Sequence, residues 1–112
     1  MNNRKASSKA YTERRLHGGV YIITNIQNGR YLLGHAAELA SVSNRFQFAV
    51  ATGACFEYRL RTDWEAMGAN VFRFAILDEI EQQPTQSLAA FLDDLAALEQ
   101  LLRADLDPAK AY

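Results

Sequence analysis

The stretch Gly18–Gly34 constrains the fold of this chain more than any other part of the sequence. Within it, Val20–Asn25 is rich in β-branched and aromatic residues, which favour a pleated, half-buried strand. The pair Asn28-Gly29 follows, and both residue types tolerate the positive φ angles of a tight hairpin turn. Arg30–Leu33 then predicts the returning strand. The sequence therefore predicts an antiparallel hairpin near its N-terminus.

Apolar periodicity after the hairpin predicts three helices and one more strand. The expected helices span His35–Val50, Glu57–Met67 and Thr85–Ala104. The expected strand spans Val71–Leu77, and a polar connector follows it over Asp78–Gln83. One charge among the seven residues of this strand predicts that both of its faces are at least partly covered. The order of elements indicates an α+β fold, a three-stranded, mainly antiparallel sheet flanked by helices.

The last predicted helix carries a leucine stripe that includes one acidic residue. Its expected core positions are Leu88, Leu92, Leu95 and Leu102, widened by Phe91 and Leu98. Glu99 lies four residues after Leu95 and three before Leu102, so it is expected on the same side as the leucines. A carboxylate among apolar side chains is costly unless it is paired or binds a cation. The residues alone leave two interpretations open, a cation site and an ion pair with Arg103 one helical turn away.

The first 17 residues differ in charge from the rest of the chain. They hold five basic residues against one acidic residue, a net charge of +4 in a chain whose total is −1. Two interpretations remain open: a partly disordered, solvated terminus with a short helix over Lys9–His17, and an arm that contacts nucleic-acid phosphates. We therefore expect a basic arm over 1–17 and a folded domain over 18–112. The basic residues of the arm are Arg4, Lys5, Lys9, Arg14 and Arg15.

Composition limits the classes of protein to which the chain can belong. With 112 residues and 49% hydrophobic content, it has the size and character of one folded domain. No apolar run is long enough to cross a bilayer and no signal-peptide pattern opens the chain, so we expect a cytoplasmic protein. Cys55 is the single cysteine, which excludes an internal disulfide and a cysteine-based zinc site. We expect its side chain to be buried.

Two tripeptides in the hairpin resemble a known family. Gly19–Tyr21, ten further residues and then Leu32–Gly34 are similar to the opening of the GIY-YIG nucleases. The Asp63–Gly68 segment before the third strand, and the later Leu98-Glu99 pair, extend the likeness over nearly the whole chain beyond the arm. The second tripeptide departs from the family pattern because Leu32 stands where the family has a tyrosine. A shift of one residue puts Tyr31 on the opposite face of the strand.

The resemblance implies hydrolysis of a DNA phosphodiester with a divalent cation, Mg²⁺ or Mn²⁺. It places the cation on Glu99, a phosphate-binding guanidinium at Arg45, and a phenol that assists the attacking water at Tyr21. His35 and Tyr31 are auxiliary candidates near the second tripeptide. DNA is the partner that this activity implies, whereas the sequence leaves the oligomeric state open.

A second function remains open beside the nuclease. Leu32 cannot form a hydrogen bond, and His35–Ala37 replaces the small hydroxyl residues that usually follow the second tripeptide of the family. The alternative is therefore an inactive GIY-YIG fold that binds nucleic acid or a protein partner. For Arg45 the corresponding alternative is an ordinary surface salt bridge.

Overall fold

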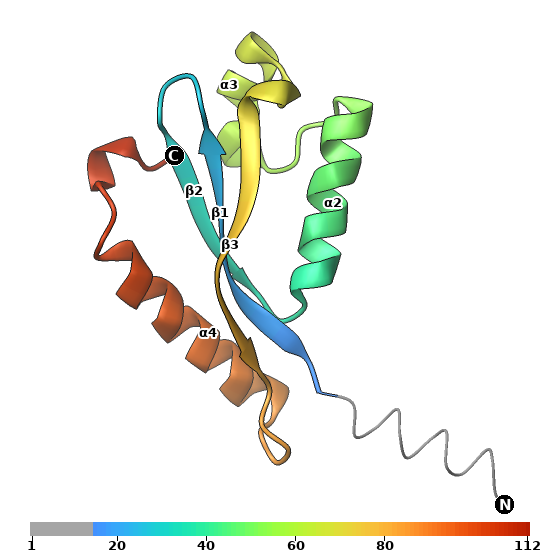
Figure 1. Ribbon diagram of the computed structural model, residues 1–112, viewed down its shortest axis with the longest axis vertical. Coiled ribbons are helices and arrows are strands. Elements are labelled where there is room, and N and C mark those ends of the chain that lie inside the picture. The colour runs from blue at the N-terminus through green and yellow to red at the C-terminus, as the bar shows by residue number, and fades with distance from the viewer. Residues whose placement is uncertain (1–14) are drawn as a thin grey trace, which may run out of the picture.

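The structure, a computed structural model, describes residues 15–112 and contains a three-stranded antiparallel sheet (Figure 1). The strands are β1 (His17–Asn25), β2 (Tyr31–Ala36) and β3 (Phe72–Glu81), in the order β2-β1-β3. Helix α2 (Leu39–Thr52) packs on one face and helix α4 (Leu88–Arg103) on the other. The α+β architecture that the sequence predicts is therefore confirmed.

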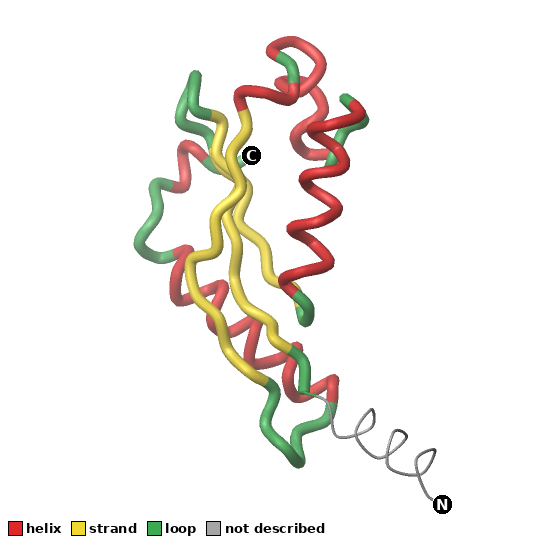
Figure 2. Tube along the Cα trace, turned by 45° about the vertical axis from the view of Figure 1, so that its right-hand side comes forward, coloured by secondary structure: helices red, strands yellow, loops and turns green. Residues whose placement is uncertain are grey.

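Short elements connect the sheet to its helices. Between α2 and β3 the chain forms a 3-10 turn at Tyr58–Leu60, helix α3 (Arg61–Met67) and a second turn at Ala69–Val71. A third 3-10 turn at Pro108–Lys110 follows α4. Figure 2 shows that these pieces cluster near the hairpin turn, at the end of the sheet away from the Glu81 end of β3. No helix among residues 15–112 has the length and apolar character that crossing a bilayer requires.

Each face of the sheet has its own hydrophobic cluster. On the α4 side, Val20, Tyr31 and Leu33 pack against residues of the helix and of the C-terminal segment. On the α2 side a larger cluster forms around aromatic rings from α2, from the segment between α2 and α3, from α3 and from β3. Its buried members are Tyr21, Ile23, Leu32, Leu39, Val42, Phe46, Ala49, Phe56, Leu60, Trp64, Val71 and Phe72. Because strand side chains alternate, Tyr21 and Tyr31 lie on opposite faces.

The hairpin forms where the sequence predicts it, with a longer turn. Thr24 pairs with Tyr31, so residues 26–30 form the loop rather than Asn28-Gly29 alone. Gly29 adopts a φ of 75° and its N–H donates to the carbonyl of Asn25 at 2.8 Å. The prediction of positive φ at this glycine is correct. The returning strand begins one residue later than predicted, at Tyr31, and continues past Leu33 to Ala36.

Strand β3 differs from its prediction in length and cover. It continues to Glu81, so the predicted polar connector over Asp78–Gln83 is wrong for its first part. Val20 pairs with Asp78 and Tyr21 with Ile76, which leaves Leu77 as the extra residue of a bulge. The face that carries Phe72 and Phe74 is partly covered, as predicted. On the other face Arg73, Ala75 and Leu77 are exposed, so the prediction of partial cover is wrong for that face. The physical reason is position: β3 is an edge strand, and the core covers only its first part.

The three predicted helices are present, but their bounds differ from the prediction, and α4 buries a different set of side chains. His35 and Ala36 belong to β2, where they pair with Val20 and Gly19, so α2 begins only at Leu39. In α4, Phe91 and Leu95 are fully buried whereas Leu88 and Leu92 are exposed. The buried stripe therefore runs through Phe91, Leu95, Leu98 and Leu102.

Two further expectations concern the N-terminus and the cysteine. Of the expected helix over Lys9–His17 most lies outside the described residues, and His17 is the first residue of β1, so that helix does not reach His17. Cys55 is exposed, because it lies in the loop after α2 and its thiol donates to the carbonyl of Glu57. The prediction that this thiol is buried is therefore wrong.

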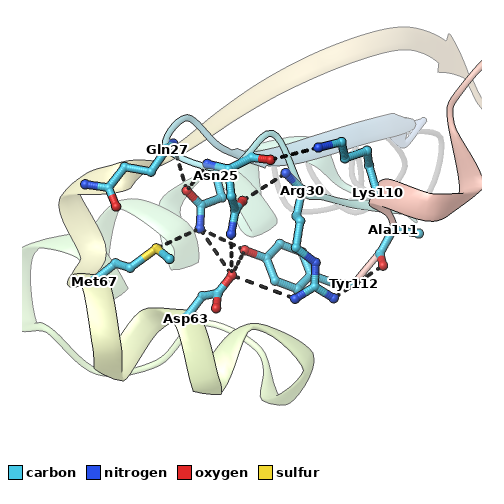
Figure 3. A network of polar contacts seen from close by, with 9 residues as sticks. Asn25, Gln27, Arg30, Asp63, Met67, Lys110, Ala111 and Tyr112 are labelled. Atoms are coloured by element: carbon cyan, nitrogen blue, oxygen red, sulfur yellow. Dashed lines mark hydrogen bonds and ion pairs between the residues drawn. The ribbon is translucent and has the colours of Figure 1, made fainter.

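A polar network joins the hairpin turn, α3 and the C-terminal residue (Figure 3). The fully buried Asn25 donates through Nδ2 to the Tyr112 hydroxyl at 3.0 Å and to Oδ2 of Asp63 at 3.3 Å. The same Oδ2 accepts from the Tyr112 hydroxyl at 2.6 Å and from Nδ2 of Asn28 at 3.0 Å. These hydrogen bonds, led by that from Tyr112, hold the pKa of Asp63 below its ordinary value. One carboxylate thus ties together three segments far apart in the sequence.

Candidate active site

Tyr21 lies on β1 directly opposite Gly34 of β2. Its ring stacks on Phe74 with 5.4 Å between the centroids, and the side chain is almost fully buried. A β-carbon added to Gly34 would lie only 2.6 Å from the Tyr21 hydroxyl. The glycine of the second tripeptide therefore makes room for the phenol of the first.

Arg45 projects from α2 toward the same place. Its guanidinium lies over the ring of Phe56, 4.2 Å from the centroid, and donates to the Phe56 carbonyl at 3.3 Å. No carboxylate among residues 15–112 lies within ion-pair distance of the Arg45 guanidinium. The surface salt bridge that was the alternative for Arg45 is therefore not formed with any described residue. The guanidinium is held in place but keeps its charge for another anion.

A shallow pocket brings these side chains together. It lies where β2 ends and the chain turns into α2, and its volume is about 370 Å³. Five of its lining residues, the predicted Tyr21, His35 and Arg45 together with Glu38 and Ser41, have polar or charged side chains. The pocket lining consists of Tyr21, His35, Ala36, Ala37, Glu38, Ser41, Val42 and Arg45.

Glu99 reaches this site from α4 through His35. The Nδ1–H group of His35 donates to Oε1 of Glu99 at 2.7 Å, and Arg103 pairs with Oε2. The Glu99 side chain is only 13% exposed, so its carboxylate is held between two positively polarised partners rather than in bulk water. The ion pair with Arg103 is thus formed, as one of the two interpretations predicts, and the carboxylate also touches a residue of the pocket.

The electrostatic surroundings of Tyr21 combine burial with opposite charges. Burial raises the pKa of the Tyr21 phenol above its ordinary value, whereas the positive charge of Arg45 lowers it. The negative charge of Glu99 also acts on the phenol and raises its pKa. Because the net direction is upward, the phenol keeps its proton at neutral pH and enters any reaction as a hydrogen-bonding group.

Glu99 is the residue in this arrangement that could hold a cation. Its two carboxylate oxygens each accept one hydrogen bond, which leaves lone pairs free, and ligating carboxylates commonly keep such outer partners. Among residues 15–112 no three His, Cys, Asp or Glu side chains gather into a ligand cluster. The donor set therefore fits an ion that keeps most of its water, such as Mg²⁺ or Mn²⁺.

The remaining sequence candidates lie elsewhere. Tyr31 packs on the α4 face with Val20 and Leu33, so the structure does not bring it to the pocket. Leu32 is buried in the α2-side cluster and supplies no polar group. Arg15 is exposed and lines a separate pocket at the start of β1. The other predicted phosphate contacts, Arg4, Lys5, Lys9 and Arg14, lie outside the described residues.

Sequence reasoning missed one residue that shapes the site. Phe56 holds the Arg45 guanidinium with both its ring and its carbonyl, although it lies eleven positions later and outside any motif. No spacing pattern signals this contact, because it depends on how the loop after α2 folds back.

Comparison with known proteins identifies the fold. The sequence matches no protein-family model and no curated protein. Among solved structures, the catalytic domain of the homing endonuclease I-TevI superposes with a TM-score of 0.60 at 24% sequence identity. The match covers 85% of this chain and 95% of that domain. The chain has the GIY-YIG nuclease fold.

The GIY-YIG fold accounts for the placement of the tripeptides in this chain. Gly19–Tyr21 lies in β1 and Leu32–Gly34 in β2, so the two motifs are neighbours across one antiparallel ladder. Leu32 is paired with Ile23, two pairs along the ladder from the Tyr21–Gly34 pair, so position 32, where the family pattern has a tyrosine, lies on the same face of the sheet as Tyr21. The GIY-YIG fold is therefore intact around a site with one polar group fewer.

Proposed function

We propose that this protein hydrolyses a phosphodiester bond of DNA with the help of Mg²⁺ or Mn²⁺. One observation carries the proposal. Arg45, which forms no ion pair with a described carboxylate, lines the same pocket as Tyr21 and as His35, the partner of Glu99. Phosphate contacts from the basic residues of the arm would add affinity without specifying sequence. Those residues are Arg4, Lys5, Lys9, Arg14 and Arg15.

Each side chain has a distinct part in this proposal. The Arg45 guanidinium binds two oxygens of the scissile phosphate. Because it already stacks on Phe56, its side chain loses less conformational freedom when it binds. The protonated Tyr21 phenol orients the attacking water by a hydrogen bond. His35 fixes the Glu99 carboxylate through Nδ1. A divalent cation bound at Glu99 supplies charge stabilisation for the phosphate and the leaving oxygen.

The direct test is nicking of supercoiled plasmid by the purified full chain. We expect nicked circles to accumulate with Mg²⁺ or Mn²⁺ and not with EDTA. Arg45→Ala should lower the rate about a hundredfold, because one charged contact to the transferring group contributes about 3 kcal/mol.

Arg73→Ala is the matched control, because the Arg73 guanidinium also donates to backbone carbonyl groups, those of Asn70 and Phe72, but does not line the pocket. It should change the plasmid rate by less than about threefold. Equal losses for the two variants, or no nicking by the wild type on any DNA tested, would contradict the proposed pocket.

A binding module is the second candidate, and Leu32 favours it. Leu32 is 2% exposed and lies within the core, and its side chain carries no hydroxyl at the position where the family pattern has a tyrosine. This candidate predicts DNA retention that weakens with salt, without nicking under any metal condition. The plasmid experiment therefore separates the two functions.

Gly34→Ala tests whether the position of the Tyr21 hydroxyl matters. The new β-carbon must displace the phenol, because the two groups would lie 2.6 Å apart. We expect nicking to slow by about tenfold to a hundredfold, since a misplacement of about 1 Å costs that much. Thermal unfolding of Gly34→Ala is measured beside the rate, because the ring that must move is buried and stacked on Phe74. Tyr21→Phe gives the comparison rate for a site without the hydroxyl, and a Gly34→Ala rate equal to wild type would show that the phenol has no part.

A further inference from the structure

The segment that joins α2 to α3 supplies the aromatic rings of two arginine–aromatic pairs. Arg45 lies over the ring of Phe56, and Arg61 lies over the ring of Tyr58 with 4.8 Å to its centroid. Phe56 is buried in the core, whereas Tyr58 is 74% exposed. The first pair therefore points into the molecule, and the second presents an aromatic face to the outside.

The outer pair, Tyr58 and Arg61, has a guanidinium charge that can bind an anion. No carboxylate among the described residues lies within ion-pair distance of Arg61. The contrast is Arg30, which lies 4.2 Å over the ring of Tyr112 but also 3.9 Å from Asp63. Arg30 thus serves an internal network, while the Tyr58–Arg61 pair has an exposed ring and an unneutralised cation.

The outer pair lies beside the candidate active site. Arg59, the residue after Tyr58, is held by a hydrogen bond from its Nε to Glu57 at 3.0 Å. Its charge still acts on Tyr21: burial raises the pKa of that phenol, and the charges of Arg45 and then Arg59 lower it. Phe56, two residues before Tyr58, contacts Arg45 directly. The segment that carries Tyr58 therefore borders the pocket that Tyr21 and Arg45 line.

An exposed aromatic ring with a neighbouring guanidinium has a specific ligand chemistry. The ring stacks on the flat face of a nucleobase, and the guanidinium binds the adjoining phosphate. A base within a duplex is covered on both faces by its neighbours, so such a ring selects an unpaired base. Phe48 is also exposed, at 66%, but no arginine among the described residues stacks on it.

We infer that Tyr58 and Arg61 form a stacking site for an unpaired base next to the phosphodiester that enters the Tyr21–Arg45 pocket. The substrate class is then DNA with a single-stranded portion beside the cleavage point, rather than uninterrupted duplex. This inference rests on the proposed function and names the substrate of the same site.

Binding can be measured without cleavage by fluorescence anisotropy of the full chain in EDTA. The probes are a fluorescein-labelled blunt duplex and the same duplex with a single-stranded tail. We expect the wild type to prefer the tailed probe, and Tyr58→Ala to weaken binding of that probe about tenfold, the value of one stacked base. Binding of the blunt duplex should stay within about twofold of wild type. Tyr58→Phe should bind like wild type, because the ring is retained.

Phe48→Ala is the matched control, since it removes another exposed aromatic ring. An unchanged affinity of Tyr58→Ala for the tailed probe would overturn the inference, as would an equal loss with Phe48→Ala or with the blunt duplex. Failure of the proposed function looks different: the wild type would then nick neither plasmid nor tailed DNA with Mn²⁺, whatever the anisotropy shows.

Discussion

Glu99→Gln is expected to lower the rate of metal-dependent plasmid nicking about a thousandfold. The charge stabilisation that a cation supplies to a phosphodiester transition state amounts to several kcal/mol, and each 1.36 kcal/mol is about a tenfold change in rate. Glutamine keeps the shape of the side chain: its oxygen can accept from Arg103, and its NH2 group can donate to Nδ1 of His35 in the other neutral tautomer of that ring. The variant therefore removes the negative charge while it preserves the contacts that position residue 99.

Two measurements separate a catalytic from a structural effect of Glu99→Gln. Thermal unfolding should shift by only a few degrees, because the Arg103 guanidinium is partly exposed and can remain hydrated. Titration with Mn²⁺, followed by electron paramagnetic resonance, should show weaker binding than to the wild type. Glu65→Gln makes the same chemical change at an exposed position of α3 and should leave both readouts unchanged. Wild-type rates for Glu99→Gln would rule out this carboxylate as the cation ligand.

The fold follows from sequence where a local signal decides the structure. The strand-forming run before Asn28-Gly29 predicts the hairpin, and the structure places a positive φ at Gly29. The end of β3 could not be predicted in this way. Asp78–Glu81 has the composition of a loop, but it is a strand because β1 extends back to His17 and offers it a partner. Pairing between distant residues, rather than local preference, decided that element.

The candidate site shows the same division. Motif spacing points to Tyr21 and Gly34, and helix periodicity points to Glu99 as an inward-facing carboxylate. Helix periodicity wrongly predicted Leu88 and Leu92 as core positions of α4, and both side chains are exposed. The contact between His35 and Glu99 joins residues 64 positions apart, and no local pattern encodes it. Partners of functional groups depend on tertiary packing, which a single sequence does not display.

The network around Asp63 makes Asp63→Ala the substitution with the largest expected effect on stability. Removal of this carboxylate deprives Asn28 and the Tyr112 hydroxyl of their acceptor, and the fully buried Asn25 loses one of its partners. A buried donor left without an acceptor costs about 1–3 kcal/mol, so we expect a loss of about 3 kcal/mol in the free energy of unfolding. For a domain of this size the melting temperature should fall by about 12–24 °C.

The pH dependence of this loss distinguishes the carboxylate from simple packing. The folded state lowers the pKa of Asp63, so its stabilising contribution is present above the unfolded value of about 4 and disappears as pH falls through the folded value. Urea unfolding should therefore show the full difference between wild type and Asp63→Ala at neutral pH, and a smaller one as the pH drops below about 4. Asp93→Ala, at an exposed position on α4, should cost less than about 0.5 kcal/mol at every pH. A difference for Asp63→Ala that stays constant from neutral to acid pH would mean that the carboxyl group holds the hairpin turn to α3 whatever its charge, and that the ionised acceptor is not required.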